Sequence, residues 1–404
     1  MRFGSSDLQG VLLESFDSHW VADLYYNGSR VLQDVPVSRP SFREDAQAKV
    51  QQSGSVTVEW SDEFATSILP VDVSSPLAPF GAQLWVYSVV EAGEFSERVE
   101  YGRFEITDVP SGRDEQMVFR GELITLGSRV ELELRELLHG VAQESFDVPS
   151  APSQLDSTWA ELAVITGLPL ERTVDDVAVN RSIMYPDNKL DAVHELMDVM
   201  LDADPHMTAD GSLSARPRVW PDPVDTLTMD GALVGVGHRM SADQVYNRVV
   251  VRATSGEQSS VLAVAELTSG PLRVRNPDGS VSPFRARTKF LSSEFVTTAG
   301  QAQAWADSTL TQVAALRSRV VPVVEKFNPL RERGDVVLIE RPNLYLVARV
   351  VTISRSGHTQ ELTVEVGGTL PRTVPVGPFD GFYAAHGLFP SDELFPDDEL
   401  FPEW

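Results

Sequence analysis

Short segments in which apolar and polar residues alternate recur along this chain, and they constrain its fold more than any other feature. Val56, Val58 and Trp60 alternate with polar residues within residues 55–60, and the same period of two recurs over residues 130–135. Successive side chains of a β-strand point to opposite faces, so each segment predicts a strand with one buried face. The fold class is therefore predicted to be α+β and mainly β.

The first part of the chain, residues 1–140, predicts one antiparallel β domain. The expected strands lie at 20–26, 30–37, 55–60, 84–90, 101–109, 117–126 and 130–135. The dipeptide Asn27-Gly28 is typical of a two-residue hairpin turn between the first two strands. The prolines at 149 and 152 indicate the boundary that follows this domain.

Two segments with helical spacing indicate a small mixed α/β domain over residues 141–226. The first helix is expected at Thr158–Thr166, with Glu161 completing a capping box at its start and Gly167 at its end. The second helix is expected at Lys189–Leu201, where apolar residues recur on one face.

The third part, residues 227–375, predicts a second β domain that contains one helix at 298–317. Thr298 and Gln301 can form a capping box at the start of this helix. Its apolar stripe consists of Ala302, Trp305, Ala306, Leu310 and Val313. The strands expected after it lie at 320–324, 335–340, 344–353 and 362–366. A helix leading into a small antiparallel barrel or sandwich is therefore expected.

Residues 376–404 differ in kind, because a Leu-Phe-Pro unit recurs there every six residues with acidic spacers. Proline in each repeat argues against a helix and against a central strand, so a flexible C-terminal tail is expected. A second interpretation is that the apolar residues enter pockets on a partner protein. The candidate partner-binding residues are Leu388, Phe389, Leu394, Phe395, Leu400, Phe401 and Trp404.

Composition limits the remaining possibilities. A length of 404 residues with 42% apolar residues predicts two to four folded domains. The chain has no cysteine, which excludes disulfides and thiolate metal sites and fits a reducing compartment. Residues 1–16 lack the pattern of a signal peptide, and no apolar run is long enough for a membrane span.

No arrangement of residues predicts catalysis, so we expect no enzyme activity, no cofactor and no metal. The seven histidines form no close pair, and His194 lacks the second histidine of a zinc protease helix. Asp198 and Asp202 share one helix face, but such pairs arise by chance among 59 acidic residues.

Two short motifs also have plain structural explanations. Gly235-Val236-Gly237 lacks the third glycine of a dinucleotide-binding loop. Arg333-Gly334-Asp335 matches an adhesion tripeptide, but a turn before the strand at 335–340 explains the glycine.

The order of elements in the second half resembles a known family. The residues that carry the resemblance are 246–251, 302–316, Pro329-Leu330, Gly334-Asp335, 345–353 and 360–366. In this order and spacing the chain resembles the minor tail, or baseplate hub, proteins of long-tailed bacteriophages. The resemblance implies two antiparallel β-barrel-like tube domains with an inserted small α/β domain.

The same resemblance implies a structural role at the tail tip of the virion. It implies a ring, pointing to three copies, that is assembled in the host cytoplasm and joins the tail tube to receptor-binding or fibre proteins. The implied partners are the distal tail protein, the end of the tape-measure protein and a fibre protein, with DNA only in transit. The formal charge of −26 argues against a surface that holds DNA and fits a channel wall that repels it.

Two other classes of function stay open at this point. Mainly β modules with scattered tryptophans can bind carbohydrate or act in adhesion. A tail-associated cell-wall hydrolase is the second alternative, since a pair of carboxylates is enough for glycoside hydrolysis.

Overall fold

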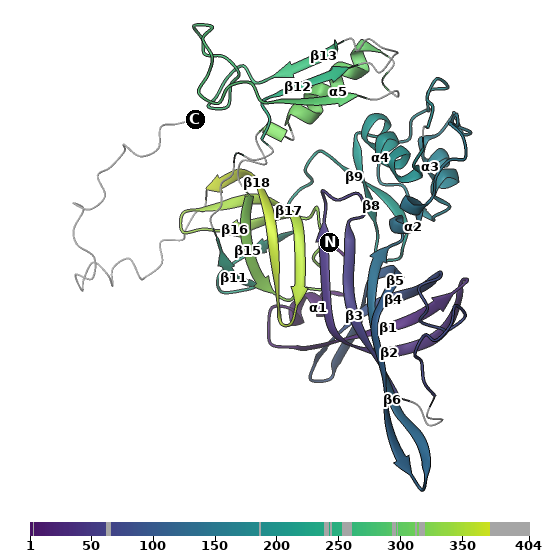
Figure 1. Ribbon diagram of the computed structural model, residues 1–404. Coiled ribbons are helices and arrows are strands. Elements are labelled where there is room, and N and C mark those ends of the chain that lie inside the picture. Colours follow the sequence, from purple (N-terminus) through teal and green to yellow (C-terminus); the bar gives the residue numbers. More distant parts are fainter. Residues whose placement is uncertain are drawn as a thin grey trace, which may run out of the picture.

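The computed structural model describes most of the chain, and all structural statements below concern those residues. They are 1–2, 4–61, 66–185, 187–237, 242, 245–252, 261–292, 296, 298–311, 313–314 and 320–371. The described chain is mainly β, as predicted, and its strands pair mostly in antiparallel fashion (Figure 1). None of the described helices is both long and apolar enough to cross a membrane.

The first section of the chain holds a short helix and six strands. They are α1 (Ser6–Val11), β1 (Asp17–Tyr26), β2 (Ser29–Asp45), β3 (Gln52–Trp60), β4 (Ala82–Ala92), β5 (Phe95–Phe119) and β6 (Glu122–Glu136). The hairpin turn at Asn27-Gly28 is confirmed, because both residues have positive φ angles, 48° and 73°. Val56, Val58, Val130, Leu132 and Leu134 point into one core, as their alternation predicts.

The prediction of one continuous strand at 117–126 is wrong. Arg120 and Gly121 have φ angles of 53° and 87°, so the chain reverses there and β5 pairs with β6 in one long hairpin. The apolar residues on both sides of this turn suggested a continuous strand, and the non-glycine residue in the left-handed conformation concealed the reversal.

A small mixed section follows. It contains α2 (Leu138–Gln143), α3 (Thr158–Thr166), β7 (Leu170–Glu171), α4 (Lys189–Met200), β8 (Ala203–Met207) and β9 (Leu213–Pro217). Helix α3 has the predicted bounds and ends at Gly167, whose φ angle is 66°. Helix α4 begins after Asn188, whose side chain accepts hydrogen bonds from the N–H groups of Leu190 and Asp191.

The capping box predicted at Glu161 is wrong. The residue that caps α3 is Ser157, which accepts a hydrogen bond from the Ala160 N–H. Glu161 instead accepts hydrogen bonds from the N–H groups of Ser153 and Gln154, in the preceding loop. Its carboxylate therefore fastens that loop to the helix.

The last described section comprises one helix and nine strands. The strands are β10 (Asp225–Leu227), β11 (Leu233–Val236), β12 (Arg248–Arg252), β13 (Val261–Glu266), β14 (Thr288–Ser292), β15 (Val320–Lys326), β16 (Val336–Glu340), β17 (Leu344–Ser356) and β18 (Thr359–Pro371). The helix is α5 (Ala299–Thr311). Thr298 accepts a hydrogen bond from the Gln301 N–H, and the predicted stripe around Trp305 is buried. The expected end of this helix, at 317, lies outside the described residues.

Helix α5 does not pack on the strands that follow it, contrary to the expectation of a helix leading into a barrel. It packs on the sheet β13-β12-β14, in a core with Val249, Val251, Ala263 and Ala265. Strands β15 to β18 enclose a different core. The apolar strand β12 offers α5 an uncovered face, which explains the pairing, and Figure 1 shows the two groups apart.

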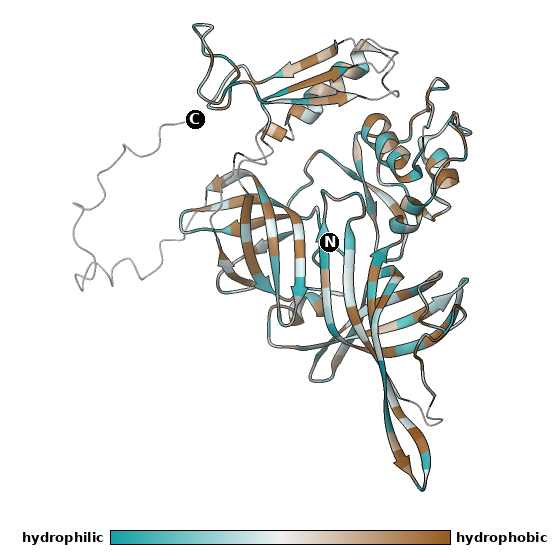
Figure 2. Cartoon of the chain, in the orientation of Figure 1, coloured by the Kyte–Doolittle hydropathy of each residue, from teal (hydrophilic) through white to brown (hydrophobic). Residues whose placement is uncertain are grey.

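One sheet nevertheless connects the beginning and the end of the chain. Its strand order is β1-β4-β5-β6-β3-β2-β17-β18-β15-β11, and β1 also pairs with β2. The connection between the two halves is an antiparallel pairing of β2 with β17, from Phe42 opposite Arg355 to Asp45 opposite Thr352. Figure 2 shows the alternation of hydrophobic and hydrophilic residues along these strands.

Candidate functional site

A cluster of buried charged and polar side chains lies where β2 meets β17, and we call it the ionic junction. Its members come from the beginning, the middle and the end of the chain. They are Arg2, Glu44, Gln51, Tyr101, Glu136, Glu325, Arg331, Arg333, Arg355 and Gln360. All of them are buried, so their polar groups depend on one another rather than on water.

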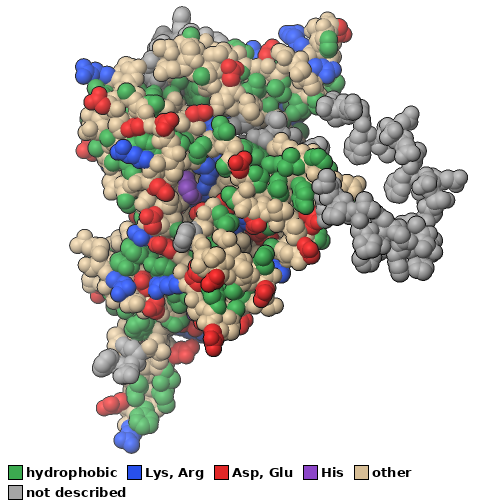
Figure 3. Space-filling model, turned by 180° about the vertical axis from the view of Figure 1, so that it is seen from behind, with side chains coloured by type: hydrophobic (Ala, Val, Ile, Leu, Met, Phe, Trp, Pro, Cys, Tyr) green, Lys and Arg blue, Asp and Glu red, His purple; other side chains and the backbone are tan. Residues whose placement is uncertain are grey.

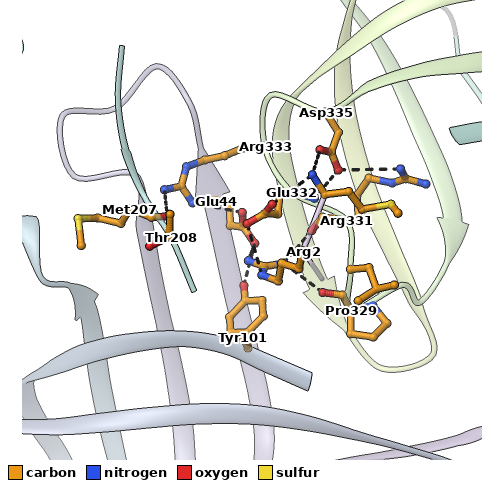
Figure 4. A network of polar contacts seen from close by, with 12 residues as sticks. Arg2, Glu44, Tyr101, Met207, Thr208, Pro329, Arg331, Glu332, Arg333 and Asp335 are labelled. Carbon is orange, nitrogen blue, oxygen red and sulfur yellow. Dashed lines mark hydrogen bonds and ion pairs between the residues drawn. The ribbon is translucent and has the colours of Figure 1, made fainter. Parts of the chain in front are cut away.

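Glu44, near the end of β2, is the centre of the ionic junction (Figure 4). Its carboxylate accepts hydrogen bonds from Arg2 Nη2 at 3.1 Å, Tyr101 Oη at 3.1 Å and Arg333 Nη1 at 3.3 Å. Arg355 also donates to it. Burial alone would raise the pKa of Glu44, but the guanidinium groups of Arg355, Arg2 and Arg333 hold it well below its usual range.

Arg333 extends the ionic junction to the small mixed section. Its Nε donates to Gln51 Oε1 at 2.6 Å, and its Nη2 lies 3.3 Å from Glu136 Oε2 at the end of β6. The same Nη2 lies 3.4 Å from the carbonyl oxygen of Met207, in β8. A single guanidinium of the last section therefore contacts both the first section and the small mixed section of the chain.

A second part of the ionic junction holds the loop between β15 and β16. Arg331 Nε donates to Glu325 Oε1 at 3.1 Å, and Arg331 Nη2 donates to Asp225 Oδ2 at 2.6 Å. Gln360 of β18 also donates to Glu325. Arg355 of β17 donates to the Arg331 carbonyl oxygen, so polar contacts bind the loop to β10, β15 and β17.

The adhesion tripeptide at 333–335 is part of this structure. Arg333 is only 1% exposed, and Asp335 is buried and accepts a hydrogen bond from the Glu332 N–H at 2.8 Å. Gly334 has a φ of 85°, which confirms the predicted turn. A receptor cannot reach this arginine without opening the core.

The contacts within the ionic junction indicate a structural role for its side chains. Every acidic group is held by a cation or a hydrogen-bond donor, and removal of one partner from such a cluster leaves a buried charge uncompensated. Its arrangement suits a rigid connection between the first and last sections of the chain, at the pairing of β2 with β17.

A cavity of about 520 Å³ lies beside the ionic junction, between α4, β17 and the loop at 46–51. Polar and charged side chains dominate its lining, including Lys49, His194, Asp204, Arg216 and Arg349. His194 Nε2 lies 3.1 Å from the carbonyl oxygen of Lys49, and burial lowers the pKa of this histidine. His194 is half-buried.

Asp198 and Asp202 do not share a helix face as expected, because α4 ends at Met200 and Asp202, with a φ of 48°, lies beyond it. Both carboxylates are engaged in ion pairs. Arg218 contacts the carboxylates of Asp198 and Asp202. Trp305 Nε1 also donates to Asp198 Oδ2 at 3.0 Å and so links α5 to α4. These contacts provide a structural role for both carboxylates.

The remaining candidates from the sequence are the glycine motif at 235–237, a metal site and the C-terminal repeats. Gly235 belongs to β11, which pairs with β15, so it is part of a sheet. Within the described ranges, no group of three or more side chains is placed to hold a metal ion. The predicted partner-binding residues, Leu388, Phe389, Leu394, Phe395, Leu400, Phe401 and Trp404, lie outside the described residues.

Sequence reasoning missed the ionic junction. One signal was available, because Glu44, Glu325 and Arg355 occupy inward-facing positions of strands where the period of two predicts apolar residues. A charge at such a position requires a buried partner, but the pattern does not say which one.

The fold built around this junction is that of bacteriophage tail proteins, as the order of elements predicted. A tail protein from Neisseria meningitidis MC58 matches 87% of this chain over 97% of its own length, with a TM-score of 0.55 and 14% identity. The 43 kDa tail protein of prophage MuSo2 from Shewanella oneidensis matches 86% over 98%, with a TM-score of 0.52 and 12% identity. No family model and no curated protein matches this chain by sequence.

Proposed function

We propose that this chain is a structural subunit of the tail tip of a long-tailed phage, where it forms a ring at the end of the tail tube. The observation that carries the proposal is the shared fold, which extends over nearly the whole chain in two tail proteins. The ionic junction is compatible with it, because buried ion pairs join the first and last sections of the chain into one unit.

The proposed partners follow from a position at the tail tip. The ring would contain three copies and contact the distal tail protein, the end of the tape-measure protein and a receptor-binding or fibre protein. It would be assembled in the host cytoplasm, and DNA would only pass through it. The net charge of −26 supports a channel that does not retain DNA.

The proposed division of the subunit follows the sequence boundaries. It comprises tube-like β domains at 1–140 and 227–375, a small α/β domain at 141–226 and a tail at 376–404. Three clusters of buried residues, within 22–134, 137–215 and 227–366, follow this division. The second β domain also contains a separate core, formed by α5 and the sheet β13-β12-β14.

The burial of the tryptophans does not favour carbohydrate binding. Scattered tryptophans suggested a sugar-binding face, but no tryptophan in the described ranges is exposed. Trp159 and Trp305 are buried, and Trp20, Trp60 and Trp85 are half-buried. Zymography on bacterial cell walls addresses the hydrolase alternative, and clearing by the purified protein would contradict a purely structural role.

Labelled antibodies against this chain, imaged on intact virions, provide the direct test. The proposal predicts label at the end of the tail distal to the capsid. It also predicts that the purified protein has a solution mass of three 44.4 kDa chains. Label elsewhere on the particle, or absence of the chain from particles, would overturn the proposal.

A further inference from the structure

The hairpin formed by the ends of β5 and β6 projects from the molecule, and we call residues 110–127 the arm (Figure 1). Its apolar side chains are exposed, with Val118 at 69% and Leu123 at 65%. A hairpin of two strands is only marginally stable on its own in water. An exposed apolar surface of this kind indicates a contact with another molecule.

The arm is apolar on both of its faces. Met117 pairs with Ile124 on one face, next to Phe119, and Val118 pairs with Leu123 on the other. Figure 3 shows hydrophobic side chains along the projecting arm. A hairpin with two apolar faces fits insertion into a groove better than docking on a flat surface.

A groove of suitable character lies at the root of the arm. Its lining includes Leu69, Val71, Val73, Phe80 and Val109, and its volume is about 500 Å³. We call it the root groove. Val71 and Val73 are 84% and 71% exposed, so the described residues leave its apolar wall uncovered. The volume lies within the range of roughly 300–1,000 Å³ in which protein pockets hold ligands, so it can accept a few side chains.

The arm cannot fill the root groove of its own chain. Gly112 lies at the groove, and Arg120 at the tip follows about eight residues later, roughly 26 Å along a strand at ~3.3 Å per residue. Paired strands continue from Gly112 opposite Val130 to Phe119 opposite Glu122, so the arm remains extended. A neighbouring copy carries the same arm and has no such restriction.

Charge also matches the arm tip to the root groove. Arg120 at the tip is exposed and lies over the Phe119 ring, 5.2 Å from its centroid. Two exposed carboxylates, Asp72 and Asp108, line the root groove. Hydrogen bonds from Ser74 lower the pKa of Asp72, which keeps it ionised. The tip also carries the exposed carboxylate of Glu122, opposite Phe119. In a chain of net charge −26, copies repel over most of their surface, so an approach that brings Arg120 rather than Glu122 to the two carboxylates is favoured.

We infer that the arm of one copy inserts into the root groove of the next copy of the same chain. The contact joins two different surfaces, so its repetition generates a closed ring if the rotation between copies is suitable. The inference rests on the proposed function, because it specifies how the copies in the proposed ring meet.

The absence of cysteine from the chain permits a direct test by disulfide cross-linking. The double variant Val118→Cys with Val73→Cys carries one thiol on the arm and one in the root groove. A second pair, Leu123→Cys with Val71→Cys, tests the same contact in case the first two thiols are too far apart or poorly oriented to form a disulfide. On oxidation we expect a ladder of covalent oligomers that disappears on reduction.

Three controls define the result. Val118→Cys alone and Val73→Cys alone should remain single chains on denaturing gels. Val118→Cys combined with Val219→Cys, another exposed valine, should give no ladder. A covalent dimer of Val118→Cys alone would indicate that arms meet arms, and that result overturns the inference. Equal cross-linking of the test pairs and the Val219 control also overturns it.

A charged substitution on the arm separates this inference from the proposed function. Leu123→Asp lies on an exposed side chain, so circular dichroism and Tm should be unchanged while the solution mass falls to that of one chain. If the variant keeps the mass of several copies, the inference fails and the ring proposal survives. If the ladder forms but the chain is absent from the tail tip, the proposed function fails and the contact stands.

Discussion

Arg333 and Glu44 form a buried ion pair, with Nη1 3.3 Å from Oε2, although 289 residues separate them. Arg333 lies in the loop before β16 and Glu44 near the end of β2. Arg355, on β17, donates to the same carboxylate. Contacts that join the first and last sections of the chain, where β2 pairs with β17, therefore converge on one glutamate.

The substitution Glu44→Gln should destabilise the protein strongly. It removes the negative charge that compensates Arg2, Arg333 and Arg355 while preserving the shape of the side chain. Loss of one partner of a buried ion pair costs roughly 3–5 kcal/mol. The free energy of unfolding in urea measures this loss. As the matched control, Asp191→Asn removes an exposed pair with Lys49 and should cost about 1 kcal/mol or less.

The substitution Glu105→Gln should stabilise the protein at high pH only. Burial, followed by the nearby charge of Glu144, raises the pKa of Glu105 from 4.5 to about 7. The folded state therefore holds this proton more tightly than the unfolded state, and stability falls as pH rises from about 4.5 through 7.

Glutamine carries no charge and does not incur this penalty. At pH 8 the free energy of unfolding of the variant should exceed that of the wild type by on the order of 1 kcal/mol. The difference is this small because solvent screens the charge of the partly exposed carboxyl. At pH 4 the two proteins should have similar Tm values. Glu115→Gln, on the exposed arm, provides the control for the same chemical change. An advantage of equal size at both pH values would contradict the assignment.

The substitution Gly54→Ala should destabilise the first core by about 1–3 kcal/mol, because it overpacks a crowded site. Gly54 lies opposite Phe42, and an added Cβ would lie 2.3 Å from the Phe42 ring. Tyr101 and Phe104 pack against that ring and limit its movement. Gly10→Ala is the control, since Gly10 lies in α1 with no atom near the added methyl group. Alanine there should be neutral or stabilising. Thermal unfolding of both variants compares the two sites.

Deletion of residues 387–404 should weaken binding to a tail partner and leave the Tm unchanged. The proposed contact residues, from Leu388 to Trp404, repeat an apolar anchor that can enter pockets on a partner. Incorporation of the truncated chain into tails, measured against the full chain, tests this prediction. Normal incorporation of the truncated chain into tails would contradict the prediction that the repeats bind a partner.

Local rules predicted a large part of the fold. Helix α3, the start of α4 and the turn at Asn27-Gly28 were predicted correctly, because caps and turns depend on neighbouring residues. Two of the wrong predictions also came from local patterns. Glu161 had the spacing of a capping box but found donors in the preceding loop, and the reversal at Arg120-Gly121 was concealed by apolar neighbours.

Alternation by itself determined that this chain is mainly β, since period-two burial follows from backbone geometry. Only the tertiary structure decided that β2 pairs with β17, that α5 covers β12 and that the charges of Glu44 and Arg333 meet. The physical reason is that strand pairing and ion pairing across hundreds of residues depend on which surfaces remain uncovered after each local unit has formed. No local pattern contains that information.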